Sequence, residues 1–153
     1  MIKPKIYKLS AVSDGLTIAA TSYGAGDQVG KLFTFALPFS RAWPVYVVGV
    51  KITCAVNVMG TYDVLLYENG VTLAADNAAA ALSIEHMKKL AALVPLSGAV
   101  AVNTMTHSQA TNLKIPIVPS NKTLYASLVT RGAHSFFTAL DDITLQIYLE
   151  SEF

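Results

Sequence analysis

The chain has 153 residues and a net charge of +1; 53% of its residues are hydrophobic and 14% are charged. This length suits one domain with a sizeable core, and the low net charge argues against direct nucleic-acid binding, which needs a strongly basic face. Average soluble domains carry about 25% charged residues, so few charges are available to cover this surface. We therefore expect part of the surface to lie against other subunits.

The chain begins with a segment that alternates charged and apolar residues. Residues 1–12 are predicted to form an N-terminal arm or edge strand, and residues 13–153 a single β-sandwich domain. Lys3, Lys5 and Lys8 alternate with apolar residues, and we expect them on one side of the strand. A signal peptide would need an apolar run of about 7–15 residues after the lysines, and none follows. No apolar run is long enough to span a bilayer.

Residues 45–59 show the clearest strand pattern. One parity is apolar and the other is smaller and more polar, which predicts a strand buried on one face. The single cysteine, Cys54, excludes an internal disulfide, and its apolar setting predicts a buried, inert thiol. The apolar parity comprises Val48, Val50, Ile52, Cys54, Val56 and Val58.

A second strand is predicted soon afterwards, at residues 62–67, beyond a turn at Gly60. The dipeptide Asn69-Gly70 follows this strand. Asn-Gly between apolar runs is a strong hairpin signal, so we expect residues 71–74 to pair briefly with the strand before them.

A short helical insertion is predicted near residues 83–90. Ser83 can cap it, and Glu85 in the first turn with lysines in the last suits the helix dipole. Pro116 cannot occupy a central ladder position, so its strand should lie at an edge. About eight strands result, which predicts an all-β, antiparallel β-sandwich with jelly-roll topology. The later strands are expected at residues 92–96, 100–105, 112–118, 124–129 and 142–150.

No grouping of chemically active residues indicates an enzyme. His86, His107 and His134 lack the close His and Glu spacing of a metal-binding strand. Asp141-Asp142 is interpreted as a turn with solvated carboxylates, since Asp is a turn former. No serine lies in a nucleophile-elbow sequence. We therefore expect a protein without catalytic activity, metal or cofactor.

The aromatic residues indicate a place where another molecule binds. Trp43 and Tyr46 flank Pro44, and Phe136 and Phe137 are adjacent. Neighbouring residues of a strand point to opposite faces, so one of the two phenylalanines should face away from the domain's own core. A second buried layer, a subunit contact or a carbohydrate platform would each explain this. The candidate subunit or capsid interface comprises Lys3, Lys5, Lys8, Trp43, Tyr46, Phe136 and Phe137.

The order of these segments resembles a known family. The chain contains the following segments in this order: a long Val/Ile strand, a glycine turn, the strand Tyr62-Asp63-Val64-Leu65-Leu66-Tyr67, an Asn77-Ala78 segment, a capped helical turn and the strand at residues 92–96. This order is similar to that in small jelly-roll auxiliary or decoration proteins of tailed bacteriophage virions. The similarity covers residues 45–96 and continues loosely into the terminal strand at residues 143–149. Residues 79–82 lack the aromatic residue and the Asp or Ser pair usual in the family, and the lysine-bearing segment has no counterpart there.

The resemblance implies a non-enzymatic virion structural protein that decorates the capsid surface after synthesis in the host cytoplasm. Its expected partners are further copies of itself, as a homotrimer, and the major capsid protein or other virion proteins. No direct contact with nucleic acid or membrane is expected. The N-terminal lysines would tether the subunit to an acidic capsid surface. The alternative is a carbohydrate- or receptor-binding β-sandwich module of a phage fibre or tail.

Overall fold

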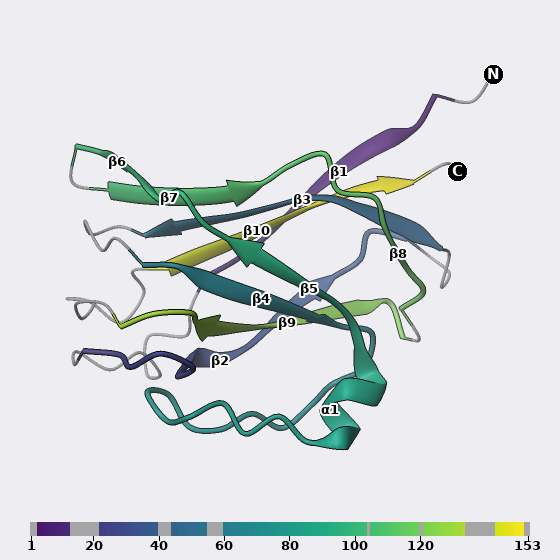
Figure 1. Cartoon of the computed structure of the whole chain (residues 1–153). Helices are drawn as coiled ribbons and strands as arrows, with labels where there is room; N and C mark the ends of the chain where they lie inside the picture. The colour runs from purple at the N-terminus through teal and green to yellow at the C-terminus, as the bar shows by residue number, and fades with distance from the viewer. Residues whose placement is uncertain are drawn as a thin grey trace.

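Two antiparallel sheets pack face to face in this protein (Figure 1). The structure is a computed structural model that describes residues 3–12, 22–39, 44–54, 60–103, 105–119, 121–133 and 143–151. The six-stranded sheet contains, in spatial order, β1 (Lys5–Val12), β10 (Ile143–Ser151), β3 (Val45–Cys54), β7 (Met105–Ala110) and β6 (Val100–Val102), while β8 (Ile115–Ile117) also pairs with β3. The four-stranded sheet contains, in spatial order, β2 (Gln28–Ala36), β9 (Thr123–Thr130), β4 (Tyr62–Tyr67) and β5 (Leu90–Leu96).

The strand pairing is that of a jelly-roll. The first half of the chain folds back on the second half, so that β1 pairs with β10, β2 with β9, β3 with β7 and β4 with β5. β10 also pairs with β3, and β9 with β4, which joins these hairpin-like pairs into two sheets. Eight strands arranged in this way form a double-sheet jelly-roll. The predicted all-β, antiparallel sandwich is confirmed, with β6 and β8 as short additions to the six-stranded sheet.

The core lies between the two sheets and is filled by alternate residues of each strand. A fully buried Leu or Ile side chain contributes about 1.5–3 kcal/mol relative to an exposed one. Strand β10 follows the predicted alternation along its length, because the side chains between its inward residues are half-exposed. Its inward side chains are 0% exposed: Ile143, Leu145, Ile147 and Leu149.

The predicted parity of β3 is wrong at its beginning. The apolar residues after Gly49 are buried as predicted, but Val48 is half-exposed and Val47 occupies the core instead. The cause is a β-bulge: the register with β10 passes from Tyr148 opposite Gly49 to Leu149 opposite Val47, which leaves Val48 without a partner on that strand. The rest of this predicted strand lies outside the described residues.

The predicted short helix is confirmed as α1 (Ile84–Lys89). Ser83 is its N-cap, and the Ser83 hydroxyl accepts a hydrogen bond from the backbone N–H of His86 at 3.4 Å. The backbone N–H of Ser83 in turn donates to Nδ1 of His86 at 3.1 Å, which completes a capping box. Glu85 lies in the first turn and the lysines in the last, as the helix dipole favours.

Residues 68–83, which we call the covering segment, do not form the predicted hairpin. Leu65, Tyr67 and Val129 point outward from the four-stranded sheet, and Val71 and Ala80 of the covering segment pack on them. Burial of this second apolar cluster outweighs the local preference of the Asn-Gly dipeptide. The chain therefore crosses the outer side of the four-stranded sheet before it reaches α1, below the sheet in Figure 1.

Asp76 anchors the covering segment to the sandwich. Its carboxylate accepts hydrogen bonds from the Tyr23 hydroxyl at 2.9 Å and from the Gly30 backbone N–H at 2.6 Å. Backbone hydrogen bonds between Gln28 and both Asn77 and Ala78, each 2.8 Å long, run beside it. The covering segment thereby satisfies part of the free edge of β2.

The predicted strand at residues 100–105 is instead a hairpin. Its two arms are β6 and β7, which pair antiparallel. Asn103 turns the chain between them with a φ of +58°. Asn tolerates this left-handed conformation well, so a turn forms within the apolar run from which one continuous strand was predicted. By contrast, Pro116 lies in β8, a three-residue strand whose one partner among the described strands is β3, and its predicted edge position is confirmed.

Candidate interaction surfaces

The structure describes two of the three histidines, His86 and His107. His86 belongs to the capping box, and its Nε2 lies 2.6 Å from the carbonyl oxygen of Thr72 in the covering segment. His107 is half-buried on β7, opposite Thr53 of β3. His134 and the pair Asp141-Asp142 lie outside the described residues. Among the residues that the structure describes, no three His, Cys, Asp or Glu side chains gather where they could hold a metal ion.

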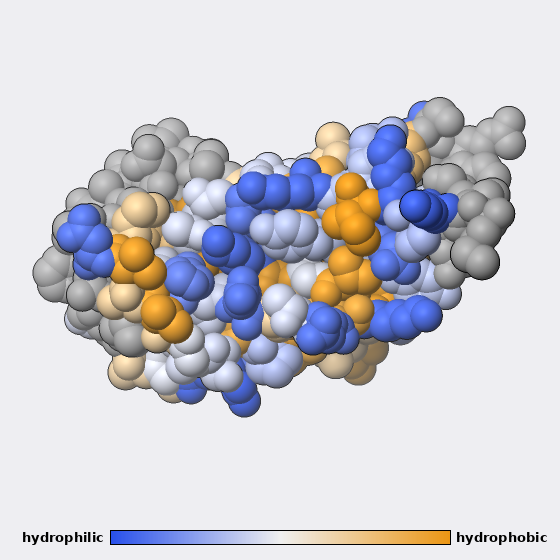
Figure 2. Space-filling model, turned by 90° about the horizontal axis from the view of Figure 1, so that it is seen from above, coloured by the Kyte–Doolittle hydropathy of each residue, from blue (hydrophilic) through white to orange (hydrophobic). Residues whose placement is uncertain are grey.

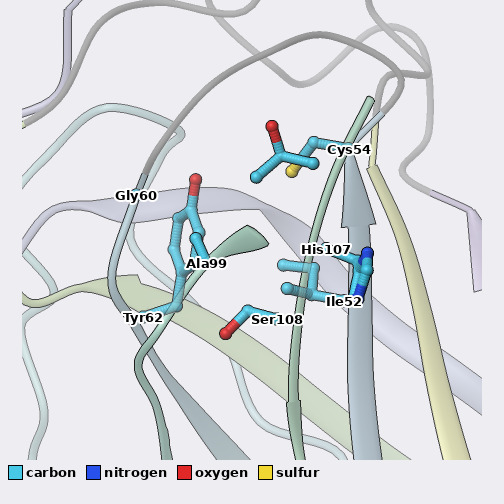
Figure 3. Close-up of a pocket in the computed structure, with 8 residues that line it drawn as sticks. Ile52, Cys54, Gly60, Tyr62, Ala99, His107 and Ser108 are labelled. Atoms are coloured by element: carbon cyan, nitrogen blue, oxygen red, sulfur yellow. The ribbon is translucent and has the colours of Figure 1, made fainter. Parts of the chain in front are cut away.

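A small space lies at one end of the sandwich, between Cys54 of β3 and Tyr62 of β4 (Figure 3). Both side chains are 1% exposed, so the predicted buried thiol is confirmed. Ser108 and Gly60 also line this space, and a Cβ atom at Gly60 would overlap the Tyr62 hydroxyl. The space is too narrow for a water molecule, so it is an imperfection of the packing rather than a ligand site.

Burial raises the pKa of the Tyr62 hydroxyl well above its usual range, and the neighbouring Cys54 adds to this effect. An unfolded tyrosine ionises near pH 10, whereas the buried Tyr62 stays neutral there. Above about pH 10 the unfolded state therefore binds fewer protons, and Tyr62 lowers the free energy of unfolding by up to about 1.4 kcal/mol per pH unit. Urea denaturation at several pH values between about pH 9 and pH 11 measures how the free energy of unfolding depends on pH. We expect this free energy to fall less steeply with pH in Tyr62→Phe than in the wild type. Equal slopes for the two proteins would contradict the assignment.

The three N-terminal lysines do not lie on one side of a strand as predicted. Tyr7 and Leu9 of β1 pack against the core, so Lys8 points outward from the six-stranded sheet. Lys5 has the parity of Tyr7, and its ammonium nitrogen lies 5.0 Å from the centre of the Tyr7 ring. Lys3 is exposed ahead of the strand. The reason is that the core needs alternate residues of β1, which fixes the strand's register against β10.

Tyr46 is the other interface candidate that the structure describes. It is half-buried on the outward side of β3, between Glu150 of β10 and Pro116 of β8. The Lys114 ammonium nitrogen lies 5.3 Å from the centre of its ring, within the range of a cation–π contact. Tyr46 and Lys8 thus share one face of the six-stranded sheet. Trp43, Phe136 and Phe137 lie outside the described residues.

Sequence reasoning missed a group of exposed apolar residues at and beside α1. Helix α1 has no buried residue, and the side chain of Ile84 is 75% exposed while that of Met87 is 55% exposed. Leu82 before the helix and Leu93 in β5 are 44% and 49% exposed. We call these four residues the α1 patch. The spacing of Ile84 and Met87, one helical turn apart, was the available signal for an apolar face.

A second apolar group lies on the β6–β7 hairpin. Val100, Val102 and Met105 are 52%, 56% and 45% exposed, and we call them the β6 patch. Figure 2 looks onto the outer face of the six-stranded sheet and shows hydrophobic residues at its left end, where β6 lies. More hydrophobic residues appear to the right, and a polar band separates the two groups. On this face, Gln146, Lys51 and Gln109 are cross-strand neighbours on β10, β3 and β7.

The outer face of the six-stranded sheet also contains a groove. The groove has a volume of about 600 Å³ and is lined by residues of β1, β3, β7, β10 and the connection from β7 to β8. Its walls combine apolar side chains with the ring of Tyr148, two amides, a lysine and a carboxylate. No local pattern predicts this groove, because the residues that line it come from strands far apart in the chain.

Comparison with known proteins adds no relative. No protein-family model matches the chain, and no curated protein matches it significantly. Among the described residues, the structure contains no helix that is long and apolar enough to cross a membrane.

Proposed function

We propose that this protein is a non-enzymatic, self-associating structural subunit of a virus particle, a capsid decoration or auxiliary protein of a tailed phage. The observation that carries the proposal is the α1 patch. Helix α1 has no buried residue, and its apolar side chains Ile84 and Met87 are exposed to solvent in the single chain. A short helix has little stability of its own, so its exposed apolar face is best explained by a partner that covers it.

The surroundings of the α1 patch suit a protein interface. Glu85 and Lys88 form an ion pair of 2.9 Å on the same helix, with side chains 69% and 66% exposed. An apolar centre with a charged rim is the usual anatomy of such a contact. Burying large apolar side chains contributes about 1.5–3 kcal/mol each before the costs of association are subtracted. A low proportion of charged residues limits the desolvation cost across the contact.

The jelly-roll supports the virion assignment by analogy, because this architecture is common in viral capsid and lectin domains. We propose a closed homotrimer, in which each subunit uses the same patch, attached to the major capsid protein or another virion protein. Lys3, Lys5 and Lys8 would serve as the capsid contact. Deleting residues 1–10 is a poor test of that contact, since it also removes Tyr7 and Leu9 from the edge of the core. Replacing the three lysines by serine is the better one.

Methionine oxidation tests whether the α1 patch is covered. Met87 of the α1 patch and Met105 of the β6 patch are exposed to similar extents in the single chain, 55% and 45%. If other subunits cover α1, hydrogen peroxide should oxidise Met87 several-fold more slowly than Met105 in the native protein, as measured by peptide mass spectrometry. Met105 is the internal control. Oxidation of Met87 at the rate of Met105 would contradict the proposed interface.

A further inference from the structure

The groove on the outer face of the six-stranded sheet has the dimensions of a ligand site. Its volume of about 600 Å³ falls within the range of roughly 300–1,000 Å³ that small-molecule sites occupy. It is open to solvent on the outer face of the six-stranded sheet, whereas α1 leads into β5 of the four-stranded sheet (Figures 1 and 2). The groove and α1 therefore lie on different sides of the sandwich.

The β-bulge in β3 shapes the floor of the groove. Gly49 lies opposite Tyr148, and a Cβ atom at Gly49 would lie 3.3 Å from Cδ2 of the Tyr148 ring. The Tyr148 ring thus packs close to Gly49, and Tyr148 also lines the groove. The bulge also turns Val48 outward, and the Val48 carbonyl accepts a hydrogen bond of 3.1 Å from the backbone N–H of Leu113 in the far wall. Bulges often re-aim side chains in this way beside binding sites.

The polar side chains of the groove have hydrogen-bond donors and acceptors that are available to a ligand. Gln109 and Asn112 bring amide groups to it, and Glu150 brings a carboxylate. Within the part of the chain that the structure describes, these three side chains form no hydrogen bond or ion pair. Asn112 is held in a left-handed conformation with a φ of +57°, which fixes the wall at this point. Donors and acceptors are thus placed beside an aromatic ring and aliphatic side chains.

We propose that this groove binds a saccharide that carries a carboxylate. A sugar ring has an apolar C–H face that packs on a tyrosine ring and aliphatic side chains, and hydroxyl groups that suit amides and carboxylates. The charge selects the acidic class, because Lys114 lines the groove, Lys8 lies opposite Tyr148, and Lys51 lies opposite Gln109. These three lysines outnumber the one carboxylate among the lining residues, that of Glu150.

An array of acidic and neutral glycans tests the proposal on the full-length protein. We expect the wild-type chain to bind glycans that contain uronic or sialic acids, and to bind their neutral counterparts at least tenfold more weakly. Binding of the acidic glycans should weaken as salt is raised, because Lys8 and Lys114 are exposed and salt screens their charges. Tyr148→Ala and the less disruptive Gln109→Ala should each reduce binding at least tenfold. Thr144→Ala, on the outward face of β10 but outside the groove, is the matched control and should bind as the wild type does.

Three results would overturn the proposal. Absence of binding to every acidic glycan would exclude the saccharide site. Equal or stronger binding to neutral glycans would exclude the acidic class. Acidic-glycan binding that survives both Tyr148→Ala and Gln109→Ala would place the site elsewhere on the protein.

Discussion

Replacing Ile84 and Met87 together by aspartate is expected to turn the assembled protein into a monomer with an unchanged fold. Both side chains are largely exposed in the single chain, so their loss removes little from the core. In the assembly, however, two carboxylates would be buried without partners, at a cost on the order of several kcal/mol. We expect the dissociation constant to rise at least about a hundredfold, which corresponds to about 2.7 kcal/mol.

Sedimentation velocity measures the mass of this variant, and circular dichroism checks its fold. An aspartate at position 84 lies in the first turn of α1, where a negative charge favours the helix dipole, so the helix should persist. Val100→Asp with Val102→Asp, in the β6 patch, whose side chains are also more than half exposed, is the matched control and should stay assembled. Dissociation of this control, with the α1 variant still assembled, would move the interface to β6.

Asp76→Ala is expected to lower the free energy of unfolding by about 2–4 kcal/mol. The substitution takes away the acceptor of two donors, the hydroxyl of Tyr23 and the backbone N–H of Gly30, and Tyr23 is only 1% exposed. A buried donor that loses its acceptor costs about 1–3 kcal/mol. Urea denaturation near neutral pH measures the change.

Two further variants separate the causes of this loss. Asp76→Asn keeps one acceptor oxygen and should lose less stability than Asp76→Ala. Tyr23→Phe removes one donor and should recover part of the loss when combined with Asp76→Ala. A stability of Asp76→Ala within about 0.5 kcal/mol of the wild type would show that Asp76 does not anchor the covering segment. Since that segment leads into α1, we also expect Asp76→Ala to weaken self-association.

Local pattern predicted the fold where one face of a strand is buried along its whole length. The alternation in β10 marks its inward residues correctly, and Ser83 marks the start of α1. It failed where distant residues decide the structure. The bulge at Val48 depends on Tyr148 and Gly49 meeting across two strands, and the hairpin signal at Asn69-Gly70 is overridden by an apolar cluster that includes Val129.

The candidate surfaces were harder to predict than the fold. A sequence pattern gives the spacing of Ile84 and Met87 but not their exposure, which depends on where the covering segment places α1. The groove depends on topology, because Tyr148 and Gln109 are brought to one face only by the pairing of β10 and β7 with β3. Of the interface candidates chosen from the sequence, Tyr46 and Lys8 lie on that same face. The roles of Trp43, Phe136 and Phe137 stay predictions.

The absolute mass of the purified protein in solution tests self-association most directly. Light scattering behind a sizing column, over a range of concentrations, compares it with the 16.3 kDa of one chain. We predict a stable closed oligomer, with three chains as the expected number. A monomer at every concentration would contradict self-association, and would favour a binding module in which the α1 patch meets a different partner.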